Sequence, residues 1–217
     1  ANARCLSLVT PDSERTMRTD LGAAMGLSTD EIGVEDFADC SHVHIEGYVL
    51  FNRDLMVKIL QSAKAAGCTI STDLASFEVV NATKDILPDL LRDYADVVFS
   101  NEVEAAAFTG LKDDYPKMAK MLGDYCETAV LKLGPHGSLV AQDGVITEIA
   151  PIRVDKPVDT TGAGDYFASG YLYGRLKGAS IADCGRFGSI LGAEIVKIMG
   201  ASLPETTWRD ITDAIVR

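Results

Sequence analysis

The chain has 217 residues, of which 47% are hydrophobic, and it carries a formal net charge of −12. A chain of this length and composition can bury a sizeable core, so we expect an ordered globular protein. The negative charge would repel a phosphate backbone, and no apolar run approaches the roughly 20 residues that span a bilayer. We therefore expect neither nucleic acid nor a membrane as a partner.

The five cysteines are widely scattered along the chain, and none of them forms the CxxC pair that is typical of zinc and redox sites. Reduced thiols are predicted, with Cys68 and Cys126 as small core residues. His42 and His44 point to the same side of a predicted strand but lack a third ligand at the right spacing. No zinc site is expected, and the free thiols and the lack of a secretory signal favour a cytoplasmic protein.

Two antiparallel strands are predicted at residues 5–10 and 15–20, joined by a turn at Pro11 and Asp12. Strand patterns at 42–47, 68–74, 96–100 and 128–134 then alternate with helical patterns at 53–67, before Tyr94, from Asn101 and at 118–125. Short strands alternating with helices predict an α/β fold with a mostly parallel sheet and helices on both faces. In such folds, ligands bind at the carboxyl ends of the strands.

The last third of the chain is predicted to contain short strands at 137–144, 145–151 and 152–159, followed by helices from Gly164 to the end. No internal repeat, linker or low-complexity segment is found. A single domain over residues 1–217 is therefore the simplest division.

One loop and the helix after it carry the clearest chemical signal. The sequence DTTGAGDYF begins at Asp159 and places Gly162 and Gly164 just before a helical pattern. Glycines permit backbone angles at which successive N–H groups converge, and a helix N-terminus carries unpaired donors, so this turn can bind an anion. The alternative is that Asp165 is only a favourable acid in the first turn of a helix, where it complements the helix dipole.

Two further motifs follow predicted strands. SNEVEAAAFTG holds an N-x-x-E motif at Asn101 and Glu104, which share one face of a helix. On its own this spacing favours an N-terminal capping box. LKLGPHGSLV holds K-x-G-x-x-G at Lys132, Gly134 and Gly137, which on its own indicates a hairpin.

Together, and in this order, these three motifs resemble those of the ribokinase-like (PfkB) carbohydrate kinases over nearly the whole chain. The stretches GYVLF, NExEAxxF and RFGSILGAEIVKIMGAS are most similar to the adenosine-kinase and nucleoside-or-sugar-kinase branch. The resemblance implies a three-layer α/β ribokinase-like fold. It also implies transfer of the γ-phosphoryl group of ATP to a primary alcohol of a sugar or nucleoside.

The resemblance also assigns roles to residues. Asp165 would be the base that takes the proton of the alcohol. Residues 162–165 would form an anion hole through backbone N–H groups, with Gly162 bending the chain and Ala163, Gly164 and Asp165 contributing donors. An ordinary aspartate is too weak a base to remove this proton from a free alcohol, so it would accept the proton late in the transfer.

For the nucleotide and its metal, the resemblance implies binding by Asn101, Glu104, Lys132, Gly134, Gly137, Thr160, Ser189 and Gly192. Asn101 and Glu104 would hold Mg²⁺ directly or through water. Asp159 and Thr161 could offer oxygens to a monovalent cation such as K⁺. For Ser189 and Gly192, which share a small-residue helix face, simple packing against another helix is the alternative to contact with adenine.

Members of this family typically begin with a further block of chain that contains a pair of glycines and a substrate-binding aspartate, and these residues are absent here. We therefore expect the chain to be the C-terminal two-thirds of a longer kinase. The alternative is a nucleotide-binding or regulatory remnant without turnover. A homodimer is left open, because an uncovered sheet edge would invite pairing with another strand.

Overall fold

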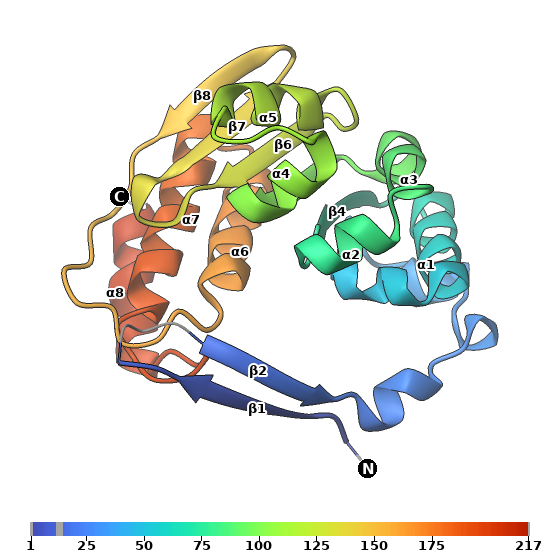
Figure 1. The fold of residues 1–217 in the computed structure, drawn as a ribbon, viewed down its shortest axis with the longest axis horizontal. Coiled ribbons are helices and arrows are strands. Elements are labelled where there is room, and N and C mark those ends of the chain that lie inside the picture. The colour runs from blue at the N-terminus through green and yellow to red at the C-terminus, as the bar shows by residue number, and fades with distance from the viewer. Residues whose placement is uncertain (1, 12–14, 217) are drawn as a thin grey trace. The chain divides into compact units, whose positions relative to one another are not determined.

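A computed structural model describes residues 2–11 and 15–216 of the chain (Figure 1). The contacts between its elements divide the chain into two compact units. The first, which we call the sheet unit, consists of residues 27–133 and 138–147. The second, which we call the helical unit, consists of residues 1–26, 134–137 and 148–217. The single domain expected for residues 1–217 stays a prediction, and each unit is described by itself.

The sheet has six strands in the order β3-β4-β5-β6-β7-β8. The strands are β3 (His42–Ile45), β4 (Thr69–Asp73), β5 (Val97–Asn101), β6 (Thr128–Lys132), β7 (Ser138–Gln142) and β8 (Val145–Ile149). Pairings from β3 to β6 are parallel, whereas β6 and β7 are antiparallel. The helices of this unit are α1 (Arg53–Ala65), α2 (Phe77–Ala82), α3 (Leu87–Tyr94), α4 (Glu102–Thr109) and α5 (Tyr115–Gly123). This arrangement confirms the predicted α/β class with a mostly parallel sheet.

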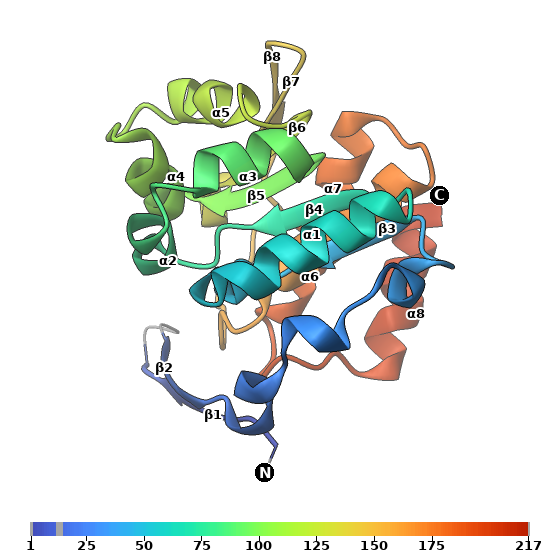
Figure 2. The same cartoon turned by 90° about the vertical axis from the view of Figure 1, so that its right-hand side faces the viewer.

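Helix α1 shows how the sequence produces this packing. Its side chains at Leu55, Met56, Leu60 and Ala63 recur at helical spacing, and all four are buried. Asn52 caps the N-terminus by accepting a hydrogen bond from the backbone N–H of Leu55 at 3.2 Å. The helix lies along β4 (Figure 2), and one hydrophobic core joins it to α3, α4, α5 and the strands.

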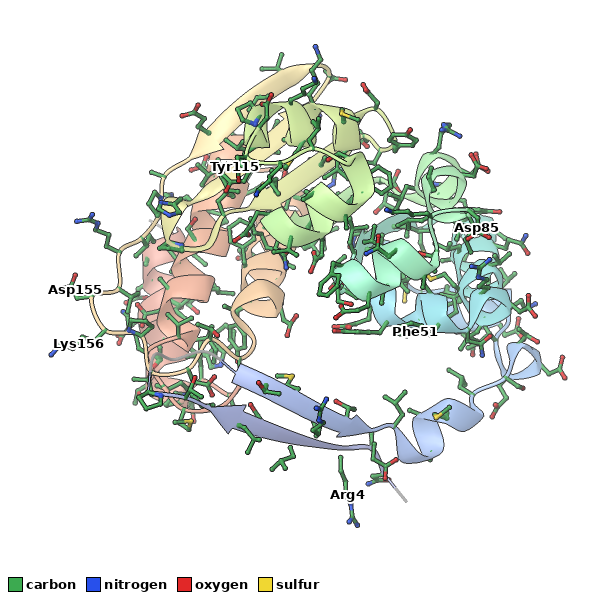
Figure 3. All side chains as sticks on the ribbon, viewed as in Figure 1. Arg4, Phe51, Asp85, Tyr115, Asp155 and Lys156 are labelled. Atoms are coloured by element: carbon green, nitrogen blue, oxygen red, sulfur yellow. The ribbon has the colours of Figure 1, made fainter. Side chains whose placement is uncertain are left out.

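The helical unit begins with an antiparallel hairpin of β1 (Arg4–Val9) and β2 (Arg15–Asp20), in which Arg4 lies opposite Asp20. The predicted strands are thus confirmed, although Asp12 of the predicted turn lies outside the described residues. Figure 3 shows the Arg4 side chain pointing away from the hairpin. The remaining helices are α6 (Ala163–Leu176), α7 (Ile181–Ile195) and α8 (Glu205–Val216).

Helices α6 and α7 approach each other closely through glycines. A Cβ atom at Gly170 of α6 would lie 2.6 Å from the carbonyl oxygen of Phe187. On the other side, a Cβ atom at Gly188 of α7 would lie 2.8 Å from the carbonyl oxygen of Phe167. Both distances are too short for any side chain, so glycine at these positions lets the two backbones pack directly.

The segment 152–158 is irregular, and the predicted strand at 152–159 is therefore wrong. Pro157 has no N–H to donate to a neighbouring strand, and the N–H of Val158 bonds to the carbonyl oxygen of Val196 instead. Figure 3 shows the side chains of Asp155 and Lys156 pointing outward from this segment. Apolar and charged residues alternate here as in a strand, but no ladder is formed.

Candidate active site

Asn101 ends β5 and caps the N-terminus of α4. Its side-chain oxygen accepts hydrogen bonds from the N–H groups of Val103 (2.9 Å) and Glu104 (2.8 Å). In return, the carboxylate of Glu104 accepts the backbone N–H of Asn101 (2.9 Å) and its side-chain amide (2.7 Å). The capping box that the spacing indicated is therefore present, and a role of either residue at a magnesium ion stays a prediction.

The environment of Glu104 decides what this pair could bind. Glu104 is buried, with 5% of the surface of the residue exposed. Burial raises the pKa of its carboxyl group, and the N–H of Asn101 and the positive charge of Lys132 offset this only in part. The Asn101 oxygen already accepts two donors, whereas each Glu104 oxygen accepts one and keeps a lone pair. Of the two, Glu104 is thus the better fit for Mg²⁺ or its waters.

Lys132 lies at the end of β6, directly opposite Asn101 in the parallel register. Because carboxyl ends of parallel strands share one edge of a sheet, β5 and β6 bring Asn101, Glu104 and Lys132 together. Lys132 supplies a positive charge to this edge, as expected for a residue near phosphates, although its role there stays a prediction.

Asp73, which the sequence reasoning did not single out, ends β4 at the same edge. One of its carboxylate oxygens accepts the N–H of Gly47 (3.1 Å) and the N–H of Ala75 (2.9 Å). Ala75 has a φ of 61°, an uncommon value for a residue with a side chain. A Cβ atom at Gly47 would lie 2.3 Å from the Asp73 carbonyl oxygen. The sequence signal that could have identified Asp73 was its position as a polar residue at the end of a buried strand.

Gly134 and Gly137 flank a short turn of the helical unit, with φ values of 52° and 90°. No atom lies within 4 Å of a Cβ built on Gly134, so its surroundings are open. At Gly137, by contrast, a Cβ would lie 2.1 Å from the carbonyl oxygen of Ile149. Packing alone thus requires glycine at 137, while the open side of Gly134 leaves room for a ligand.

The loop before α6 has the shape that its glycines predicted. Gly162 precedes the helix with a φ of 80°, and the N–H of Ala163 donates to the carbonyl oxygen of Thr160 at 3.2 Å. The next two N–H groups, of Gly164 and Asp165, belong to the unpaired first turn of a 14-residue helix. The Asp165 side chain is exposed beside them. An exposed carboxylate next to two available donors could act on an alcohol and an anion together.

Asp159 is buried, with 2% of its surface exposed. One carboxylate oxygen accepts the backbone N–H (2.8 Å) and the hydroxyl (2.6 Å) of Thr161. The other accepts the N–H of Gly200 at 2.9 Å. Asp159 therefore braces the loop from inside, and its use by a monovalent cation together with Thr161 stays a prediction.

Ser189 and Gly192 lie on α7, and Gly192 faces α6. A Cβ at Gly192 would lie 3.4 Å from the carbonyl oxygen of Ala163, and Ser189 is 9% exposed. A methyl group at Gly192 would only just reach ordinary contact distance of α6, so helix packing does not by itself require glycine there, and the contact with adenine that the resemblance implies stays a prediction.

The predicted residues thus fall into two groups. Asn101, Glu104 and Lys132 share one edge of the sheet unit. The others belong to the helical unit; they are Gly134, Gly137, Asp159, Thr160, Thr161, Gly162, Ala163, Gly164, Asp165, Ser189 and Gly192.

A comparison with protein families matches residues 1–208 to the pfkB family carbohydrate kinases. The chain belongs to this family. Relatives include an adenosine kinase of Dictyostelium discoideum, which is 31% identical over 209 residues, covering 88% of this chain and 61% of the relative. An adenosine kinase of Saccharomyces cerevisiae is 29% identical and matches 93% of this chain and 63% of its own length. These relatives confirm the resemblance to the adenosine-kinase branch of the family.

Solved structures of the family share the fold. A probable sugar kinase from Rhizobium etli superposes with a TM-score of 0.90 at 29% identity, covering 98% of this chain and 65% of the other. The adenosine kinase from Sinorhizobium meliloti has a TM-score of 0.90 at 27% identity, covering 98% and 66%. The ribokinase-like fold is therefore confirmed. The chain spans about two-thirds of the length of these family members, and none of its described helices is long and apolar enough to cross a membrane.

Proposed function

We propose that the protein transfers the γ-phosphoryl group of ATP to a primary alcohol of a small molecule, with Asp165 as the base. The observation that carries this proposal is the loop at 162–165, where an exposed carboxylate lies beside two available N–H donors at the N-terminus of α6. Membership of the pfkB carbohydrate kinases supports the reaction class.

In this mechanism, Asp165 orients the hydroxyl of the acceptor and takes its proton as the oxygen bonds to phosphorus. In this proposal, the N–H groups of Gly164 and Asp165 stabilise the negative charge that develops on the transferred group. Ala163, whose N–H is already bonded to Thr160, would help to shape the loop rather than donate. Most of the rate enhancement would come from positioning and charge stabilisation, as in other phosphoryl transfers.

ATP supplies the phosphoryl group, and Mg²⁺ would neutralise the charge on its phosphates. We propose that Glu104 holds the ion through its remaining lone pairs, that Asn101 keeps that carboxylate in place, and that Lys132 adds positive charge at the same edge. Of the two glycines in the turn, Gly134 is a better candidate than Gly137 for contact with a phosphate, because the space around it is open.

The acceptor is proposed to be a nucleoside or a related sugar. Several relatives are named adenosine kinases, and another, from Thermococcus kodakarensis, is a cytidine kinase at 29% identity. A panel of nucleosides and free sugars would identify the acceptor. A potassium requirement would involve Asp159 and Thr161, and equal activity after replacing K⁺ by a larger organic cation would exclude it.

We further propose a cytoplasmic protein that can form a homodimer. The five cysteines are all free thiols, as is usual in a reducing compartment. The β1–β2 hairpin exposes Leu6 (59%), Leu8 (54%) and Met17 (38%), which are the kind of side chains that an interface covers. Light scattering of the purified protein would give the mass, and a monomer at every concentration would exclude the dimer.

The test of the reaction uses the protein encoded by the complete gene, assayed with MgATP against the acceptor panel. Asp165→Asn should lower kcat by about 10² to 10⁴ while leaving ATP affinity nearly unchanged, because it removes the base but not the N–H donors. Asp155→Asn, which removes the same charge from an exposed loop position, is the matched control and should retain full activity. Near-normal turnover by Asp165→Asn would refute the assignment. ATP binding without any turnover by the wild type would favour the non-catalytic alternative.

A further inference from the structure

Tyr166 directly follows Asp165, and its side chain contacts the chain after α7. Its hydroxyl donates to the carbonyl oxygen of Ala201 at 3.4 Å and accepts the N–H of Leu203 at 3.3 Å. Its ring stacks on Trp208 with centroids 5.9 Å apart and planes inclined by 25°. One side chain thus joins the first turn of α6 to the connection between α7 and α8.

A second attachment joins the residues that precede α6, Val158 and Asp159, to the same connection between α7 and α8. The buried carboxylate of Asp159 accepts the N–H of Gly200, and the N–H of Val158 bonds to the carbonyl oxygen of Val196. We call residues 196–203 the C-terminal segment. The loop at residues 158–166, which includes Asp165, is therefore bonded to this segment at both of its ends.

Between these attachments, Ala201 of the segment lies close enough to Gly162 to leave little room for a side chain at that position. A Cβ built on Gly162 would lie 3.3 Å from the Cβ of Ala201 and 3.6 Å from a ring carbon of Tyr166. The C-terminal segment therefore packs beside the loop at Gly162. If the segment moved away, the left-handed turn at Gly162 would lose part of its support.

We propose that Tyr166 is a positioning residue, which holds the C-terminal segment against the loop and thereby fixes the direction of the Asp165 carboxylate. The role rests on the proposed function of Asp165. Phosphoryl transfer depends on alignment, and displacement of a reacting group by about 1 Å can reduce the rate by about 100-fold. Tyr166 touches no reacting atom in this scheme and acts only through the loop.

The matched substitutions are Tyr166→Phe and Tyr173→Phe. Both tyrosines belong to α6, and both rings lie against another aromatic side chain, Trp208 for Tyr166 and Phe187 for Tyr173. Within the described residues, the Tyr166 hydroxyl makes hydrogen bonds and the Tyr173 hydroxyl makes none. In the protein encoded by the complete gene, Tyr166→Phe should lower kcat by about 3- to 10-fold with both KM values unchanged. Tyr173→Phe should match the wild type.

Amide hydrogen exchange tests the contact itself. In Tyr166→Phe, the amide of Leu203 loses its acceptor and should exchange about tenfold faster, whereas the amide of Cys184 within α7 should not change. The coupling should also act in reverse, so that Gly162→Ala accelerates exchange at Leu203 and changes the emission of Trp208, the single tryptophan of the chain.

Two results would overturn this proposal. The first is unchanged exchange at Leu203 in Tyr166→Phe, which would show that the hydroxyl does not hold the segment. The second is faster exchange with a kcat equal to that of Tyr173→Phe, which would leave Tyr166 a structural residue only. If the wild type has no turnover, the proposed reaction fails by itself. The response of Leu203 to Gly162→Ala then decides whether the segment and the loop are coupled.

Discussion

Gly134 and Gly137 occupy the same turn and both have positive φ, yet alanine should affect them very differently. At either position, a left-handed alanine costs about 1 to 2 kcal/mol. At Gly137 the new Cβ would also lie 2.1 Å from the carbonyl oxygen of Ile149, so backbone must move. Overpacking of this kind adds about 1 to 3 kcal/mol. Gly134→Ala meets no atom within 4 Å and should cost only the first amount.

Thermal unfolding followed by circular dichroism measures this difference. For a chain of this size, 1 kcal/mol corresponds to about 2 to 4 °C in Tm. Gly137→Ala should therefore unfold several degrees below Gly134→Ala. Calorimetric titration with MgATP supplies the second readout, in which Gly134→Ala should weaken binding if phosphates lie along the open side of the turn. Equal losses of stability in the two variants would refute the packing argument, and unchanged affinity in Gly134→Ala would remove that residue from the nucleotide site.

Three further predictions concern burial and strain. Burial raises the pKa of Glu104, so this group destabilises the folded protein as the pH rises from the unfolded-state pKa to the folded-state pKa. As the pH is lowered through that range, the free energy of unfolding of the wild type should increase relative to that of Glu104→Gln. Urea titrations that show no such increase would contradict this prediction. Burial raises the pKa of Cys126 to about 12, so iodoacetamide at neutral pH should label the exposed Cys5 and Cys40 long before Cys126, as mass spectrometry would show. Ala75→Gly should raise the free energy of unfolding by up to about 1 kcal/mol because it relieves a left-handed alanine, and a loss of stability would show that the strain lies elsewhere.

Much of the fold could be predicted because its elements follow local rules. The buried positions of α1 recur at helical spacing, and Asn52 provides the cap. The turn between β7 and β8 consists of Asp143 and Gly144, with φ values of 52° and 75°, as suits a two-residue hairpin. His42 and His44 do lie on one side of β3, since both imidazole rings bond to the hydroxyl of Ser71 at 2.8 Å. Each of these features depends on a few neighbouring residues.

Features that depend on distant residues were not predictable. The alternation in residues 152–158 suggested a strand, but strand formation requires a partner, and the N–H of Val158 bonds to Val196, far along the chain. Asp73 was overlooked because its bond to the N–H of Gly47 arises only when β3 and β4 lie side by side, whereas its bond to the N–H of Ala75 is local. The spacing of Asn101 and Glu104 gave the capping box correctly, but it could not show that Glu104 would be buried.

The close packing of α7 against β8 and α6 limits which substitutions can compensate for one another. A methyl group at Gly185 would meet side-chain atoms of Ile149, the nearest at 2.5 Å, so a smaller residue at 149 could make room for it. For a Cβ built on Gly170, the three nearest atoms all belong to the backbone of Phe187 and Gly188, so no change of side chain removes them. In a search for second-site suppressors, Gly185→Ala should therefore yield partners at Ile149, whereas Gly170→Ala should yield none at Phe187.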